Sequence, residues 1–303
     1  MGFLYLLESI RMPVLNEFML AITYLGDEIA FLVTAMIVFW CVDKHQGYYV
    51  LSVGFIGTLA NQFMKLWFRI PRPWIRDENF TILEQAKEGA GGYSFPSGHT
   101  QSSVGTFGSI AATTGNKIIR IVCIVVMILV PFSRMYIGVH TPADVLVAAT
   151  MAIALIFVLR PVVLGKNGKY IPVLLGIMTV LAVAYLCFVS FYPFPADIDA
   201  HNLESGTKNA YTLLGSLLGM LVVYYVDEKW LKFSTKAIWW AQVLKVGIGL
   251  LLVLAIKEGT RSILNLVLGE LAGRAARYFL MVIVAGIVWP LSFKWFAKLG
   301  SKE

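Results

Sequence analysis

Side chains that could act on an anionic substrate gather in three short segments of the chain. The first segment, residues 65–73, reads Lys-Leu-Trp-Phe-Arg-Ile-Pro-Arg-Pro. The second, residues 95–100, reads Phe-Pro-Ser-Gly-His-Thr, and the third, residues 133–144, reads Ser-Arg-Met-Tyr-Ile-Gly-Val-His-Thr-Pro-Ala-Asp. Cations, histidines and a carboxylate are the groups that bind a phosphate and move protons on it.

The cations of these segments predict an anion-binding site. Lys65, Arg72 and Arg134 supply three positive charges, and a guanidinium can bind two phosphate oxygens at once. Ser97 and Gly98 stand at a predicted helix start, where free backbone N–H groups and the helix dipole favour an anion. Because glycine has no Cβ, Gly98 also permits a close approach of the backbone.

Two histidines and an aspartate predict the chemistry at this site. The Thr-Pro pair at 141–142 predicts a helix start, which places Asp144 in the first turn and within reach of His140. A carboxylate on one ring nitrogen fixes the tautomer and leaves the other nitrogen as a nucleophile. His99 remains as a separate proton donor. The set therefore predicts phosphoryl transfer in which lysine and arginine take the place of Mg²⁺, and the sequence has no carboxylate cluster that would hold a metal.

The elements that must position these residues are membrane helices. Of the 303 residues, 58% are apolar and only 14% are charged, and the mean hydropathy is +0.74. An average soluble domain carries about 25% charged residues, and the apolar residues here come in runs that suit a hydrocarbon core about 30 Å thick. We expect an all-α, polytopic helical bundle with about nine spans, near residues 28–42, 46–68, 99–115, 118–138, 142–163, 170–191, 210–226, 238–256 and 276–296.

The orientation of the bundle follows from its charged loops. If the spans alternate, all three segments lie on one face of the membrane. The opposite face carries 12 Lys/Arg, against 9 on the face of the segments when Lys65, Arg72 and Arg134 are set aside. The positive-inside rule then places the long connection 69–98 outside the cytoplasm.

The three segments resemble the signatures of the type 2 phosphatidic acid phosphatase superfamily, Lys-x6-Arg-Pro, Pro-Ser-Gly-His and Ser-Arg-x5-His-x3-Asp. Every fixed letter is present, in order and at the family's internal spacing. The resemblance covers about residues 28–163, which it implies to be the phosphatase catalytic core. Residues 1–27 are expected to form an interfacial N-terminal segment, and residues 164–303 a C-terminal transmembrane extension.

The resemblance also implies a role for each matched residue. His140 would attack phosphorus and form a phosphohistidine, with Asp144 holding its ring. His99 would protonate the leaving oxygen and then activate water. The resemblance implies phosphate binding by Lys65, Arg72, Ser97, Gly98 and Arg134. Family members need no metal or other cofactor, and the membrane-bound ones mostly hydrolyse lipid phosphates or diphosphates at the non-cytoplasmic surface.

Two other functions are open at this stage. One is hydrolysis of a soluble sugar phosphate, because the glucose-6-phosphatase branch of the superfamily also has nine spans; its gap between the lysine and the Arg-Pro pair is longer than the six residues found here. The other is a catalytically silent lipid-binding or transport protein of the same fold. An intact nucleophile, acid and cationic cradle favour the enzyme.

The expected partners are the lipid phosphate or diphosphate substrate and membrane lipids. The net charge of +7 suits anionic headgroups, and it does not predict nucleic-acid binding, because the basic residues are scattered between the spans. Compact loops and the lack of a targeting segment predict a bacterial plasma membrane.

Some polar residues stand outside the three segments. Arg69 and Arg76 suit interfacial anchors. Lys245 lies in the middle of an apolar run, where it would pair with a buried carboxylate, snorkel or line a headgroup path. The basic stretch 257–278 would either contact headgroups or help to recognise an anionic substrate.

Overall fold

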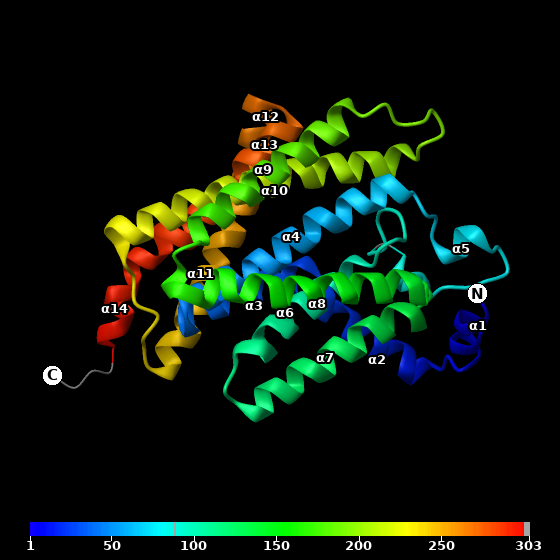
Figure 1. Cartoon of the computed structure of the whole chain (residues 1–303), viewed down its shortest axis with the longest axis horizontal. Helices are drawn as coiled ribbons and strands as arrows, with labels where there is room; N and C mark the ends of the chain where they lie inside the picture. Colours follow the sequence, from blue (N-terminus) through cyan, green and yellow to red (C-terminus); the bar gives the residue numbers. More distant parts are fainter. Residues whose placement is uncertain (88, 300–303) are drawn as a thin grey trace. The chain divides into compact units, whose positions relative to one another are not determined.

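The computed structural model describes residues 1–87 and 89–299, and every regular element in this part of the chain is a helix. Glu88 and the last four residues of the predicted extension, 300–303, lie outside the described residues. Figure 1 shows long helices joined by short connections, with two longer loops after α4 and α9. The predicted all-α class is therefore confirmed.

The chain divides into two compact units, which are described separately. Unit 1 contains Met1–Thr34, Tyr49–Pro161 and Phe194–Gly206, and unit 2 contains Ala35–Tyr48, Val162–Pro193 and Thr207–Glu303. All three predicted motif segments belong to unit 1.

The helices that begin in unit 1 come mostly from the first half of the chain. They are α1 (Gly2–Ser9), α2 (Pro13–Thr23), η1 (Tyr24–Gly26), α3 (Glu28–Ile37), α5 (Pro73–Arg76), η3 (Glu84–Ala86), α6 (Gly98–Thr113), α7 (Lys117–Tyr136), α8 (Pro142–Leu164) and α10 (Ala200–Val226).

The helices that begin in unit 2 come mostly from the second half. They are η2 (Val38–Val42), α4 (Lys44–Phe68), η4 (Gly165–Gly168), α9 (Ile171–Phe191), η5 (Asp227–Leu231), α11 (Trp239–Gly259), α12 (Arg261–Leu268), α13 (Glu270–Ile283), η6 (Val284–Val288), η7 (Trp289–Ser292) and α14 (Phe293–Lys298).

All nine predicted apolar runs are helical, but not all are suited to cross a membrane alone. Within residues 1–87 and 89–299, six helical segments are long and apolar enough, and a seventh would be the pair Pro13–Gly26 and Glu28–Val42, which is bent by 55°. The 16 residues of α6 reach about 24 Å at about 1.5 Å each, less than the hydrocarbon core. Helix α4 has 25 residues, but polar side chains at both of its ends reduce its hydropathy. A count of nine spans stays a prediction.

The N-terminal helices of unit 1 pack against the segment that precedes His140. Met19 and Leu20 of α2 form a buried cluster with Tyr136, Ile137 and Val139. An apolar side chain buried in this way contributes about 1.5–3 kcal/mol. The predicted interfacial segment therefore supports the backbone of the third motif.

The turn between α7 and α8 needs a glycine. Gly138 has φ +90°, and a Cβ built there would lie 2.8 Å from Nη2 of Arg11. The same arginine donates from Nε to the carbonyl of Tyr136 (3.0 Å). The turn is thus held from outside by the N-terminal segment, and it delivers His140 to the start of α8.

Candidate active site

The first two residues of the site are His140 and Asp144, both almost fully buried. Nδ1 of His140 lies 3.5 Å from Oδ2 of Asp144, which is longer than a good hydrogen bond; among the described residues Nδ1 has no hydrogen-bond partner. Oδ2 also accepts from Ser94 Oγ (2.6 Å) and from the backbone N–H of Thr141 (2.7 Å). The carboxylate is therefore held beside the ring by two donors.

Arg72 contacts the other nitrogen of the same ring. Its Nη1 lies 2.9 Å from Nε2 of His140 and 3.0 Å from the carbonyl oxygen of Val139. A guanidinium can only donate, so Nε2 must be the acceptor and the ring proton is assigned to Nδ1, on the side of Asp144. Nε2 is thus the nitrogen that carries the lone pair, and this lone pair faces a cation that could bind phosphate.

The surroundings keep this imidazole neutral. Burial lowers the pKa of His140 well below its usual range, and the nearby cations Arg72, Arg134 and Lys65 lower it further. Burial also lowers the pKa of Arg72, to about 10. At neutral pH the pair is therefore a neutral imidazole next to a charged guanidinium.

Two further predicted cations are buried close to this pair. Lys65 donates from Nζ to the carbonyl oxygen of Tyr93, and Arg134 donates from Nη1 to Thr23 Oγ1 (2.7 Å). Nε of Arg134 has no partner within the described part of the chain. It is a free donor from which a phosphate oxygen could accept a hydrogen bond.

The start of α6 is tied to the start of α8. The backbone N–H of Ser97 donates to the carbonyl of Asp144 (3.1 Å), and the Ser97 side chain accepts from the N–H of Thr100 (3.4 Å) as an N-cap. Gly98 is the first residue of the helix. The second and third motif segments thus share a hydrogen bond, as the prediction of one site requires.

His99 has a partner that the sequence did not indicate. Its Nε2 lies 2.6 Å from Oδ1 of Asp27, which connects η1 to α3. The backbone of Gly26 makes this contact possible, because a Cβ there would lie 2.9 Å from Cβ of His99. In the sequence, Asp27 and Glu28 are typical acidic residues at a helix start, so no local signal distinguishes Asp27.

A cavity of about 990 Å³ lies beside Arg72 in unit 1. One wall comes from the connection 69–98, and the other from residues 195–202, including His201. The two loops are linked where the N–H of Asp199 donates to Oη of Tyr93 (3.3 Å). The cavity gives Arg72 a mixed polar and apolar approach. The residues of its second wall were not among the predicted site residues.

Comparisons with known proteins identify the family of the chain. Residues 46–167 match the PAP2 superfamily, and residues 211–302 match the PAP2 superfamily phosphatase transmembrane extension. A curated relative, phosphatidylglycerophosphatase B of Bacillus subtilis (strain 168), is 30% identical over 165 residues, which are 50% of this chain and 76% of that protein. The chain belongs to the PAP2 superfamily. The resemblance found in the three motif segments is confirmed.

A second relative adds to the range of PAP2 proteins that this chain is similar to. The undecaprenyl-diphosphatase BcrC of the same Bacillus strain is 32% identical over 114 residues, which are 38% of this chain and 55% of that protein. No solved structure matches the chain significantly. With its family, its extension and its apolar helices, this PAP2 protein is an integral membrane phosphatase.

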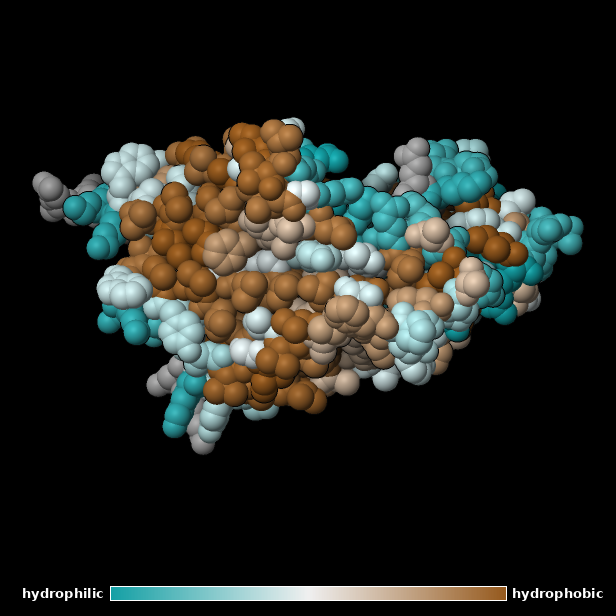
Figure 2. Space-filling model, turned by 90° about the horizontal axis from the view of Figure 1, so that it is seen from above, coloured by the Kyte–Doolittle hydropathy of each residue, from teal (hydrophilic) through white to brown (hydrophobic). Residues whose placement is uncertain are grey.

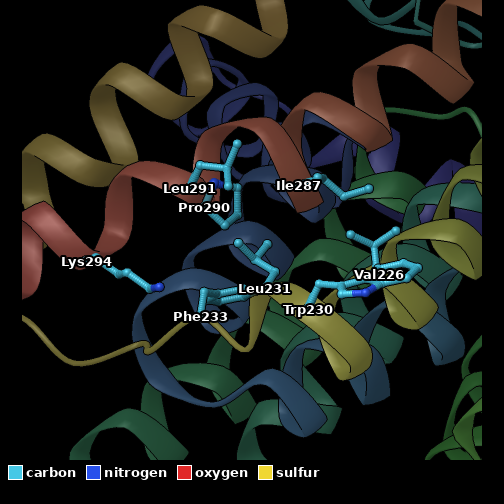
Figure 3. A pocket seen from close by; sticks show the side chains of 8 residues that line it. All are labelled: Val226, Trp230, Leu231, Phe233, Ile287, Pro290, Leu291 and Lys294. Carbon is cyan, nitrogen blue, oxygen red and sulfur yellow. The ribbon is translucent and has the colours of Figure 1, made fainter.

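Unit 2 of this PAP2 protein holds a second, smaller pocket of about 210 Å³ (Figure 3). Its lining is mainly apolar, with Trp230, Phe233 and Leu291 around it, and Lys294 extends toward it from α14. The lining includes neither a carboxylate nor a histidine in the described chain. This pocket therefore lacks the groups for phosphoryl transfer.

Lys245 is fully buried in unit 2, but it does not meet a carboxylate. Its Nζ donates to the carbonyl of Thr235 (3.1 Å) and lies 4.5 Å from the ring centre of Phe293. A carbonyl and an aromatic ring hold the ammonium in place of the predicted acid. Among the described residues no group of three or more His, Cys, Asp or Glu could hold a metal ion, and independence from metals stays a prediction.

Proposed function

We propose that this phosphatase removes the terminal phosphate from a lipid phosphate or diphosphate by way of a phosphohistidine on His140. The observation that carries the proposal is the 2.9 Å contact between Nη1 of Arg72 and Nε2 of His140, with Asp144 beside Nδ1. This contact supports the proposal because it joins a neutral imidazole to a guanidinium that could bind phosphate. A purely structural histidine has no need of a lone pair aimed at a buried guanidinium and a carboxylate beside its other nitrogen.

The first step begins when a phosphate oxygen takes the Arg72 donor away from Nε2. The free electron pair of Nε2 then attacks phosphorus, the Nε2–P bond forms, and the bond from phosphorus to the leaving oxygen breaks. Burial and the charge of Arg134 lower the pKa of His99 to about 4, so His99 takes up its proton only when the anionic phosphate is bound. It then gives this proton to the leaving oxygen. Asp144 stabilises the positive ring that results, because its carboxylate lies beside Nδ1.

The second step returns the enzyme to its starting state. Water gives a proton to the neutral His99, and the water oxygen bonds to phosphorus as the Nε2–P bond breaks. Lys65, Arg134 and the N–H groups at Ser97 and Gly98 stabilise the phosphoryl oxygens in both steps. Asp27 acts as a positioning residue, since its carboxylate favours the protonated form of His99.

The substrate class rests on the relatives and on the cavity. The relatives are named as phosphatases of phosphatidylglycerophosphate and undecaprenyl diphosphate, both lipids with a terminal phosphate. The 990 Å³ cavity beside Arg72 is large enough for a headgroup, while Figure 2 shows a broad hydrophobic surface that suits lipid chains. A soluble sugar phosphate is the competing substrate.

We also propose the bacterial plasma membrane as the location, with the site on the non-cytoplasmic side. Both relatives are bacterial, and the lysine and arginine count favours this orientation. A cysteine placed at the exposed Glu84, in a variant without the three natural cysteines, would report the side. Labelling of intact cells by a membrane-impermeant thiol reagent supports the orientation, and labelling only after lysis contradicts it.

The chemical proposal is tested with purified protein and a panel of phosphatidylglycerophosphate, polyprenyl diphosphate, phosphatidate and a sugar phosphate. We expect phosphate release from a lipid substrate, unchanged by a chelator, and loss of both activity and trapped phosphoenzyme in His140→Ala. His45→Ala, which changes a histidine of unit 2, is the matched control. Full activity of His140→Ala, or a preference for the sugar phosphate, would overturn the proposal.

A further inference from the structure

A buried arginine in the transmembrane extension has unsatisfied hydrogen-bond donors. Arg277 of α13 is only 6% exposed. Its Nε and Nη1 are both buried and have no hydrogen-bond partner among the described residues. A guanidinium cannot lose its charge at physiological pH, so the free energy cost of burying it without an acceptor is high. Such a group is expected to meet an anion that the protein chain itself does not supply.

The neighbouring charges of unit 2 increase the need of Arg277 for an anion. Arg274 and Arg261 are nearby cations that repel the charge of Arg277, and Glu258 is the nearby acid that attracts it. Glu258 is 64% exposed on its side chain and lies 3.9 Å from Lys257 instead. The positive charge around Arg277 is therefore not balanced by the nearby carboxylate.

Arg274 is held in place on the same helix. Its Nε donates to Oγ1 of Thr212 (2.7 Å), and its guanidinium lies 5.6 Å from the ring centre of Tyr278. Arg277 lies 5.9 Å from the same ring. Both guanidinium groups thus contact one ring, and two arginines three residues apart on one helix are neighbours on its surface, which suits a doubly coordinated phosphate.

The surface next to these arginines is apolar. Helix α12 packs against α13, as Figure 1 also shows. It exposes Ile263, Leu266 and Val267, at 65%, 87% and 71%. In a membrane protein this face contacts lipid chains. A lipid therefore gains apolar contacts here that a free inorganic ion cannot make.

We propose that Arg277 and Arg274 bind the phosphate group of an anionic membrane phospholipid, whose chains lie along α12. The site is formed by residues that the proposed phosphatase reaction does not use, and the bound lipid is a phosphodiester that is not hydrolysed. The lipid supplies the acceptors that Nε and Nη1 lack, and so it stabilises the packing of α12 on α13.

The test measures lipid binding rather than activity. Thermal unfolding of the purified protein in a neutral detergent is followed while dioctanoyl phosphatidylglycerol, dioctanoyl phosphatidylcholine or inorganic phosphate is titrated. We expect phosphatidylglycerol to raise the unfolding temperature most, and its apparent Kd to weaken about 10- to 100-fold in Arg277→Gln, since hydrogen bonds to charged groups are lost. Arg160→Gln removes an exposed arginine as the matched control and should bind like the wild type.

Each outcome decides the proposal. Unchanged phosphatidylglycerol binding in Arg277→Gln overturns it, as does an equal response to inorganic phosphate, which would indicate a free-anion site. If Arg277→Gln does not fold, Arg274→Gln replaces it, and unchanged binding there overturns the proposal in the same way. His140→Ala should keep full lipid binding, so a failure of the proposed reaction is distinguishable from a failure of this site.

Discussion

Replacing Asp27 by asparagine tests whether the N-terminal segment takes part in catalysis. Asparagine keeps the size of the side chain and removes its charge. In the native protein Oδ1 of Asp27 lies 2.6 Å from Nε2 of His99. If His99 is the general acid, its protonated form loses a partner in the variant, and the transition state that needs this proton becomes less stable.

The expected magnitude follows from the geometry of the pair. Two unit charges about 4 Å apart near a protein surface interact by about 4 kcal/mol. The Asp27 side chain is 37% exposed, so solvent screens part of this energy, and we expect about 1.4–2.8 kcal/mol to be lost. This corresponds to a fall in kcat of about 10- to 100-fold.

The assay is steady-state phosphate release from a lipid phosphate in mixed micelles, measured as a function of pH. The alkaline limb of the kcat profile should move to lower pH by at least about one unit, which a merely structural role would not cause. Asp77→Asn is the control, because Asp77 is a carboxylate of unit 1 that binds Tyr5 instead (2.9 Å). A wild-type kcat with an unmoved limb in Asp27→Asn, or an added loss when it is combined with His99→Ala, would refute the reasoning.

Two further predictions concern the nucleophile. Ser94→Ala removes the 2.6 Å hydrogen bond to Asp144 and should lower kcat about tenfold, since such a bond to a charged group contributes about 1.5–3 kcal/mol. The control is Ser52→Ala, at a buried serine whose Oγ has no partner in the described chain. Equal kcat values for the two variants would contradict the role of Ser94. Burial and nearby cations lower the pKa of His140 in the folded protein, so below about pH 6.5 the unfolded chain binds one proton more than the folded chain. The free energy of unfolding therefore falls by up to about 1.4 kcal/mol for each pH unit below this value. Thermal unfolding in detergent between pH 5 and 8 should show this loss, and His140→Asn should reduce the slope; an identical slope in both proteins would argue against it.

Much of the site could be predicted because its residues are close together in the sequence. The four-residue spacing of His140 and Asp144 across a Thr-Pro helix start is a local pattern, and the contact between them is observed. The same holds for Ser97, which caps α6 as an N-cap serine should. Helices also formed at every predicted apolar run, because runs of this length cannot satisfy their backbone groups in lipid in any other way.

The partners of these residues could not be predicted, because they are distant in the chain. Asp27 meets His99 from 72 positions away, and Thr23 binds Arg134 from 111 positions away. Neither residue differs in type or spacing from an ordinary helix-end residue. The second cavity wall, 195–202, is likewise brought to Arg72 only by the folding of unit 1.

The amino-acid sequence by itself determined the class of this protein, an integral membrane phosphatase of helices, and the identities of the groups that would act on phosphorus. Local spacing and hydropathy are sufficient for that, since both act over a few residues. Only the tertiary structure decided which nitrogen of His140 faces a cation, which carboxylate accompanies His99, and which arginine of the extension has buried donors without an acceptor in the described chain. These depend on packing between distant helices, where burial and the available hydrogen-bond acceptors are set by the whole unit.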